Sequence, residues 1–229
     1  MVNNKLIAKN ASIIFIGVLL AKPINFLLKI IMTRFLGPEK FGIYTLSFAI
    51  FSIITMITLI GLPVAIPRLV AYYAGKKQLH KVKTLIRNSI FIVLCLSIFL
   101  SILVFLLADQ IALLFGNTLL TPLIQLFAFA IPFYTIYTIT QKAIEGLKKV
   151  RYSTIAELVL NIIRAVAISA ALFLGYKLFG VVIAYIITTI LALLLSFYFL
   201  NTKVLNIIQT TPTKNLYKNI LKFTLPLSV

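Results

Sequence analysis

Two positively charged side chains, Lys22 and Arg164, stand near the middle of long apolar stretches. At 1.5 Å per helical residue, Lys22 lies roughly 16 Å and Arg164 roughly 15 Å from the start of its stretch. A cation that faces lipid at that depth costs ~2.5–3.5 kcal/mol on insertion scales, so both should face a bundle interior or a watery cavity. Such a pair favours the binding of an anionic ligand. Lys29 lies roughly 27 Å along its stretch, where its stem lets the ammonium reach water, so we expect a structural role for it.

Polar residues at helical spacing accompany both central cations. Lys22 and Asn25 share one face, and Pro23 between them can kink the helix. Three further sets repeat this spacing: Glu157, Asn161 and Arg164; Tyr134, Tyr137 and Gln141; and, more weakly, Tyr185, Thr189 and Ser196. Simpler interpretations remain open, because Arg164 can pair with Glu157 two turns away and the tyrosines can serve packing alone.

The remaining reactive side chains favour neither an enzyme nor a cofactor. The single histidine, His80, lies in a basic segment, the four acids are scattered, and Cys95 is the only cysteine. Neither a metal site nor a cysteine–histidine pair can be assembled from this set, so the sequence predicts no metal and no cofactor. The net charge of +18 suggests nucleic-acid binding in a soluble protein, but 62% hydrophobic residues leave too little polar surface for one.

The apolar stretches predict a polytopic, all-α membrane protein. About 20 residues cross a hydrocarbon core about 30 Å thick. Six stretches meet that length, at about 11–31, 43–66, 89–108, 121–141, 154–174 and 180–200. A seventh apolar run begins near Ile220, and the first stretch is too long for a signal peptide, so we expect the N-terminus to be retained.

The distribution of lysine and arginine predicts the orientation. Most of the 22 cations lie before the first stretch, in the connections between the second and third and between the fourth and fifth, and after the sixth. The positive-inside rule therefore predicts a multi-pass protein of the cell membrane with a cytoplasmic N-terminus. Residues 75–88 are predicted to form an amphipathic helix at the headgroups, 201–209 a weaker one, and 109–116 a short interfacial helix on the other side. Most of these cations are expected to set topology and attract anionic lipid.

Two segments carry a resemblance to a known family. The first contains Arg34-Phe35-Leu36-Gly37-Pro38-Glu39 and Phe41-Gly42, and further along Gly61-Leu62-Pro63 and Arg68. The second is the segment 141–152. Both resemble polysaccharide and lipid-linked oligosaccharide flippases, within the larger group that includes multidrug exporters. The resemblance implies a carrier of two six-helix lobes around a central cavity. Residues 1–205 would form the N-terminal lobe, and residues 206–229 a cytoplasmic linker and the start of a seventh span.

The resemblance implies transport of a saccharide linked to a polyprenyl diphosphate by alternating access. In this hypothesis Lys22 and Arg164 attract the diphosphate, and Glu157 balances Arg164 in the empty site. The residues expected to bind sugar hydroxyls or water are Asn25, Asn161, Tyr134 and Tyr137. Partners would be the bilayer, this anionic lipid and a second lobe or another copy of the chain. A multidrug-type exporter coupled to a cation and a truncated or non-transporting membrane subunit are the alternatives.

Overall fold

The computed structural model describes residues 4–201, with side chains described there except at 4–18, 20 and 151. Six helices account for nearly all of these residues: α1 Asn4–Leu59, α2 Leu62–Gly75, α3 Leu79–Leu114, α4 Leu120–Gly146, α5 Val150–Phe173 and α6 Lys177–Phe199. Five helical stretches in this part of the chain are long and apolar enough to cross a membrane, beginning with Ala21–Leu59. The fold is therefore that of an all-α polytopic membrane protein.

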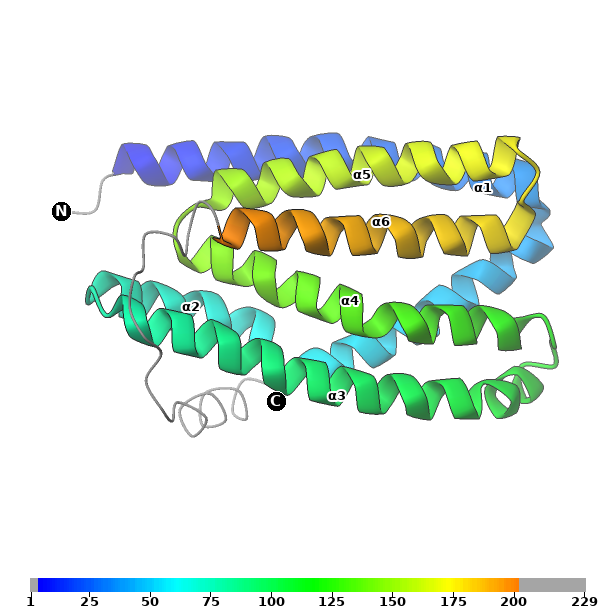
Figure 1. Cartoon of the computed structure of the whole chain (residues 1–229). Helices are drawn as coiled ribbons and strands as arrows, with labels where there is room; N and C mark the ends of the chain where they lie inside the picture. Colours follow the sequence, from blue (N-terminus) through cyan, green and yellow to red (C-terminus); the bar gives the residue numbers. More distant parts are fainter. Residues whose placement is uncertain (1–3, 202–229) are drawn as a thin grey trace.

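Helix α1 is two membrane passes joined by a sharp corner. Its 56 residues contain Gly37 with φ 77° and ψ 164°, a conformation that glycine adopts readily and that no α-helix contains. Pro38 follows and restricts the chain further. Figure 1 shows the result: the chain runs the length of the bundle, turns at this corner and returns diagonally. We call residues 4–36 the first arm and residues 38–59 the second arm.

A second glycine corner ends the second arm earlier than the sequence analysis predicted. The predicted span 43–66 stops at Leu59, because Ile60 and Gly61 both have positive φ, 30° and 68°. Helix α2 then begins at Leu62, with Pro63 in its first turn, where a missing N–H removes no helical hydrogen bond. The Gly61-Leu62-Pro63 motif thus separates a spanning helix from a short one.

The prediction that residues 75–88 form a separate amphipathic helix is wrong. Gly75 ends α2, and residues 79–88 are the first turns of the 36-residue α3. Its apolar face is buried against protein: Val82, Leu85 and Ile86 pack with residues of α2 such as Ile66. Similarly, 109–116 is not a separate helix, because α3 continues to Leu114 before Gly116 with φ 64°. The predicted helix at 201–209 and the seventh run lie almost wholly outside the described residues.

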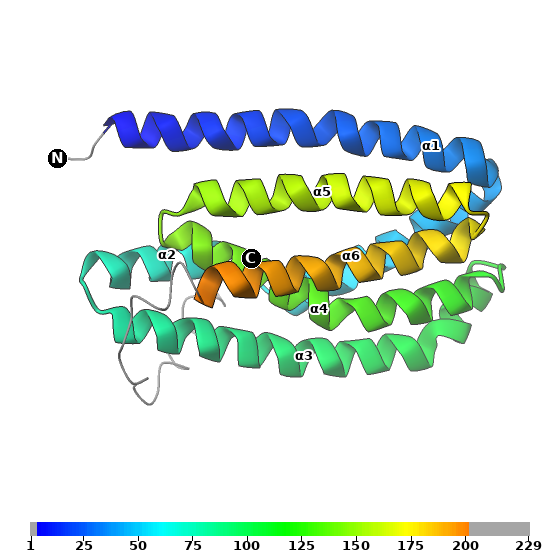
Figure 2. The same cartoon turned by 45° about the horizontal axis from the view of Figure 1, so that its top comes forward.

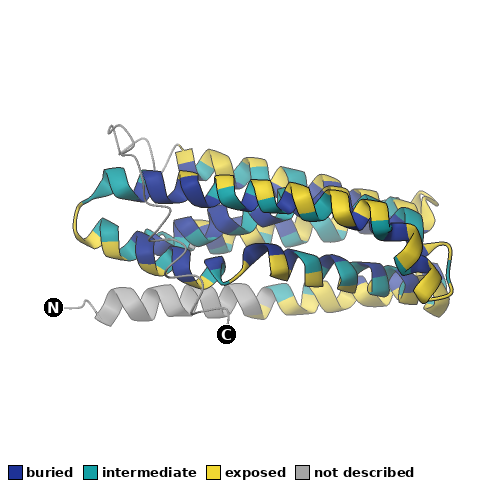
Figure 3. Ribbon diagram, turned by 90° about the horizontal axis from the view of Figure 1, so that it is seen from below, coloured by how far each residue is buried: buried dark blue, intermediate teal, exposed yellow. Residues whose placement is uncertain are grey.

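The connections α2–α3 and α4–α5 lie at one end of the bundle, and the connections α3–α4 and α5–α6 lie at the other (Figures 1 and 2). The first arm of α1 lies along α5, α3 along α4, and α6 along α4 and α5. Buried residues line the inner faces of the bundle, whereas large apolar side chains such as Phe91, Phe99 and Leu114 are exposed outward (Figure 3). An apolar exterior of this kind requires lipid as its solvent.

Close packing at one end of the bundle depends on a glycine. A methyl group added at Gly146, the last residue of α4, would lie 2.8 Å from the Cα and O atoms of Pro67 and from Cβ of Val70 in α2. Two of these three atoms belong to the backbone and cannot rotate away. Helix α2 is therefore seated directly on the end of α4.

Replacement of Gly146 by alanine should therefore destabilise the lobe. We expect Gly146→Ala to reduce the free energy of unfolding by about 1–3 kcal/mol through overpacking, measured as a lower thermal midpoint of the purified protein in detergent. Gly75→Ala is the matched control, because nothing lies within 4 Å of an added methyl group there. Equal midpoints for the two variants would contradict the close approach.

Candidate functional site

The first arm of α1 and helix α5 run in the same direction, and one ring contact fixes their register. Phe35 and Phe173 meet edge to face with ring centroids 4.8 Å apart. Arg164 lies nine residues before Phe173, about 14 Å along the helix, which is the level of Phe26 on α1. Arg164 is thus level with Phe26 and within one residue of Asn25, with Lys22 about one turn to one side and Lys29 about one turn to the other.

A cavity of about 390 Å³ opens beside Arg164 between both arms of α1, α5 and α6. We call it the arginine cavity. Its lining is Asn25, Leu28, Lys29, Met32, Phe41, Tyr44, Thr45, Phe48, Arg164, Ile168 and Tyr185. The charged side chains in this lining are two cations, Lys29 and Arg164. An apolar cavity with a few convergent polar groups is the usual form of a small-ligand site.

Arg164 itself is held by an aromatic ring and has no described acidic partner. Its Cζ atom lies 4.6 Å from the ring centroid of Tyr185, which is a cation–π contact. Its Nε atom is buried without a hydrogen-bond partner. An ion pair joins Lys142 and Glu145 at 2.8 Å, whereas Glu157 is exposed and no described ion pair joins it to Arg164. The predicted alternative of an Arg164–Glu157 bridge is therefore absent from this part of the chain.

The cavity brings together some of the residues proposed from the sequence. Asn25 and Arg164 line it together. Lys22 is exposed on α1 outside this lining, and Asn161 is half-buried on α5. Tyr137 accepts a hydrogen bond from Nε2 of Gln141 at 3.2 Å on α4.

Tyr134 belongs to a different cavity. That cavity, of about 380 Å³, lies between the second arm of α1, the start of α2 and α4. Phe48 lines both cavities, and its ring meets those of Tyr185 and Phe51 at 5.5 and 5.7 Å. Phe51 in turn meets Tyr134 at 5.4 Å. This aromatic wall separates Tyr134 from the arginine cavity.

Four polar lining residues were not among the site residues proposed from the sequence: Lys29, Tyr44, Thr45 and Tyr185. Lys29 follows Asn25 by four residues, so its helical face was a usable signal. Tyr44 and Thr45 come from the second arm, which folds back beside the first only because of the corner at Gly37. Their approach to Arg164 depends on tertiary structure.

Comparison with solved structures shows the fold. A MATE protein in the straight conformation superposes with a TM-score of 0.82 at 20% identity, covering 98% of this chain and 52% of that one. An outward-facing multidrug resistance MATE family transporter of the MOP superfamily gives 0.74 at 20% identity, again covering 98% and 52%. A MOP superfamily transporter from Pyrococcus furiosus Vc1 (DSM3638) gives 0.74 at 19% identity, with the same coverage. The chain thus has the fold of about half of these proteins.

Sequence comparison gives the family. Stage V sporulation protein B of Bacillus subtilis (strain 168) is 25% identical over 172 residues, which are 73% of this chain and 33% of that protein. The chain therefore matches a third to a half of the length of these relatives. The polysaccharide biosynthesis protein family matches residues 7–229, nearly the whole chain. With this match and a bundle of membrane-spanning helices, the chain belongs to the polysaccharide biosynthesis protein family.

Proposed function

We propose that the chain forms one lobe of a membrane exporter that carries a saccharide linked to a polyprenyl diphosphate. The observation that supports this most strongly is Arg164, a cation held inside the bundle beside a cavity and without an acidic partner in the described part of the chain. A charge at that depth is costly unless it has a use. An anionic cargo supplies the missing counter-charge.

The arginine cavity suits a phosphate-bearing ligand. Its volume of about 390 Å³ lies within the range of small-molecule sites, about 300–1,000 Å³. Arginine presents planar N–H donors that match phosphate oxygens, and Lys29 adds a second positive charge one turn away. Asn25, Tyr44 and Thr45 offer donors and acceptors for sugar hydroxyls or water.

The other proposed residues would act around this cavity. Lys22, exposed about one turn from Asn25 on α1, would extend the positive surface along the path of the cargo. Asn161 and Tyr137 would contact sugars, and Tyr134 would do so from the neighbouring cavity. Glu157 would balance Arg164 electrostatically at a distance while the site is empty.

Alternating access requires a second rigid body that moves against this one. Residues 1–205 would form the first body, and 206–229 the link to the second. The relatives are two to three times as long as their matched parts, which accords with a two-lobe carrier. The second lobe, or another copy of the chain, would complete the path in the cell membrane.

A multidrug-type exporter is the second candidate, and the similarity to MATE structures favours it. An exporter of cationic drugs needs acidic residues where its cargo binds. Both charged residues in the lining of the arginine cavity are cations, so we favour the anionic cargo.

Binding to the purified chain tests the proposal. Arg164→Ala and Lys29→Ala should each weaken the binding of polyprenyl diphosphate by about tenfold or more, because a hydrogen bond to a charged group contributes ~1.5–3 kcal/mol. Native mass spectrometry measures the bound fraction, with polyprenyl alcohol as the phosphate-free control ligand. Lys177→Ala, at the start of α6, is the control variant.

Translocation in cells extends the same test. Export of a lipid-linked saccharide should fall strongly with Lys22→Ala and with Arg164→Ala. Unchanged export in both variants would remove the proposed site.

The stability of Arg164→Met separates a binding role from a structural one. An unsatisfied buried donor costs about 1–3 kcal/mol, and a cation–π contact contributes about 0.5–1 kcal/mol when exposed and about 2 kcal/mol when desolvated, so removal of both should leave stability nearly unchanged. The measurement is the thermal midpoint in detergent without ligand. A midpoint lowered by several degrees would instead identify Arg164 as a structural residue.

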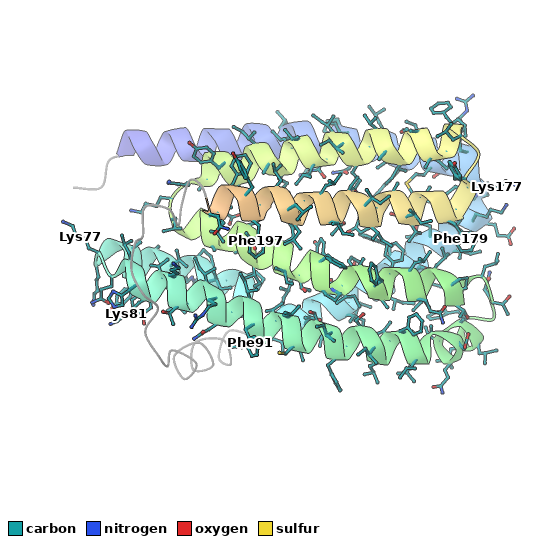
Figure 4. All side chains as sticks on the ribbon, viewed as in Figure 1. Lys77, Lys81, Phe91, Lys177, Phe179 and Phe197 are labelled. Atoms are coloured by element: carbon teal, nitrogen blue, oxygen red, sulfur yellow. The ribbon has the colours of Figure 1, made fainter. Side chains whose placement is uncertain are left out.

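Cysteine labelling tests the orientation. With Cys95 replaced by serine, Lys77→Cys should react with an impermeant maleimide only after cells are opened, and Lys177→Cys should react in intact cells. The two lysines lie at opposite ends of the bundle (Figure 4). The reverse pattern would invert the proposed topology.

A further inference from the structure

The hairpin formed by the end of α2 and the start of α3 concentrates positive charge. We call residues 68–87 the basic hairpin. Its lysines and arginines are Arg68, Lys76, Lys77, Lys81, Lys83 and Arg87. The sequence contains no acidic residue between Glu39 and Asp109. Figure 4 shows Lys77 and Lys81 at the end of the bundle remote from Lys177. The hairpin therefore carries charge that its own segment does not neutralise.

The length of α3 places this hairpin at the membrane surface. Exposed apolar side chains on α3 extend from Phe91 to Leu114. That distance is about 35 Å, close to the hydrocarbon thickness of about 30 Å. The turns from Leu79 to Asn88 continue about 15 Å further. The headgroup layer adds roughly 5–8 Å on each side, so the basic hairpin starts in this layer and ends just beyond it.

Two lysines of the hairpin are held on tyrosine rings. Nζ of Lys76 lies 4.3 Å from the ring centroid of Tyr72 and 2.5 Å from its hydroxyl oxygen. Nζ of Lys81 lies 5.7 Å from the ring centroid of Tyr73. The two rings meet edge to face with centroids 5.3 Å apart, and Tyr72 is 54% exposed. Two ammonium groups are thus ordered on neighbouring rings at the surface.

The placement of these lysines over tyrosine rings is more specific than the orientation of the protein in the membrane requires. Lysines that only orient a membrane protein need charge in the connection and no fixed geometry. Here Gly146 of α4 packs closely against Pro67 and Val70, which holds the backbone of α2 against the rest of the lobe. Tyrosine and lysine together are typical of the interface, where a ring meets the acyl boundary and an ammonium meets phosphate.

We propose that the basic hairpin is a binding site for an anionic phospholipid of the cytoplasmic leaflet, whose headgroup phosphate lies between Lys76 and Lys81. The bound lipid would neutralise part of the charge of the basic hairpin and hold α2 and α3 against the membrane. The site is separate from the arginine cavity and does not depend on the identity of the cargo. It depends on the orientation that the distribution of cations predicts.

Lipid retention by the full chain tests the site. Native mass spectrometry of the purified protein, with phosphatidylglycerol or phosphatidylcholine in the detergent, counts the lipids that remain bound. We expect preferential retention of phosphatidylglycerol, reduced by about an order of magnitude in Lys76→Gln/Lys81→Gln, because each lysine near an anionic surface changes affinity by about fivefold. Lys76→Arg/Lys81→Arg keeps the charges and should retain the lipid, and Lys177→Gln at the other end is the control for charge alone.

Three results would overturn the proposal. In the first, the unchanged protein retains the two phospholipids equally. In the second, the glutamine variant retains as much phosphatidylglycerol as the unchanged protein. In the third, polyprenyl diphosphate displaces phosphatidylglycerol at a far lower concentration than added phosphatidylglycerol does. The last result would make the hairpin a cargo site. Circular dichroism of each variant shows whether the helices are retained.

Discussion

A cation inside an apolar bundle without a described acidic partner is the constraint around which this lobe is arranged. Exposure of Arg164 to lipid would cost free energy, and no described ion pair joins it to the exposed Glu157. The fold instead places a tyrosine ring against the guanidinium and leaves a cavity on its open side. The ring supplies part of the stabilisation, and Nε of Arg164 is buried without a hydrogen-bond partner. This unsatisfied donor is the reason that we propose a ligand-binding role for Arg164.

Two glycine corners make that cavity possible. Gly37 folds the second arm of α1 back beside the first, which brings Tyr44 and Thr45 to the level of Arg164. Gly61 ends the second arm, so that α2 turns away to pack on α4. The aromatic wall around Phe48 then divides the interior into a cationic cavity and a second cavity near α2. Movement of the second arm would change both cavities together.

Much of this architecture was predictable because a bilayer limits the choices. Apolar stretches of about 20 residues predicted an all-α bundle that spans the membrane, and the midspan position of Arg164 led us to propose it as a site residue. What the sequence could not supply was register between helices. Counting from the start of each stretch placed Lys22 at the level of Arg164. The Phe35–Phe173 contact instead places Phe26 at that level, next to Asn25 and between Lys22 and Lys29. Likewise, the pattern of Leu79, Val82 and Ile86 is the same whether the face meets headgroups or α2, and only tertiary structure distinguishes the two.

The most direct test of the central claim locates the phosphate of the cargo in the protein. A polyprenyl diphosphate with a photoreactive group next to its diphosphate can be crosslinked to the full chain, and the attached peptides identified by mass spectrometry. We predict crosslinks to the lining of the arginine cavity, in the first arm of α1 around Asn25 to Met32 and in α5 around Arg164 to Ile168. These crosslinks should be lost in Arg164→Ala. Crosslinks confined to the basic hairpin, or unchanged in that variant, would contradict it.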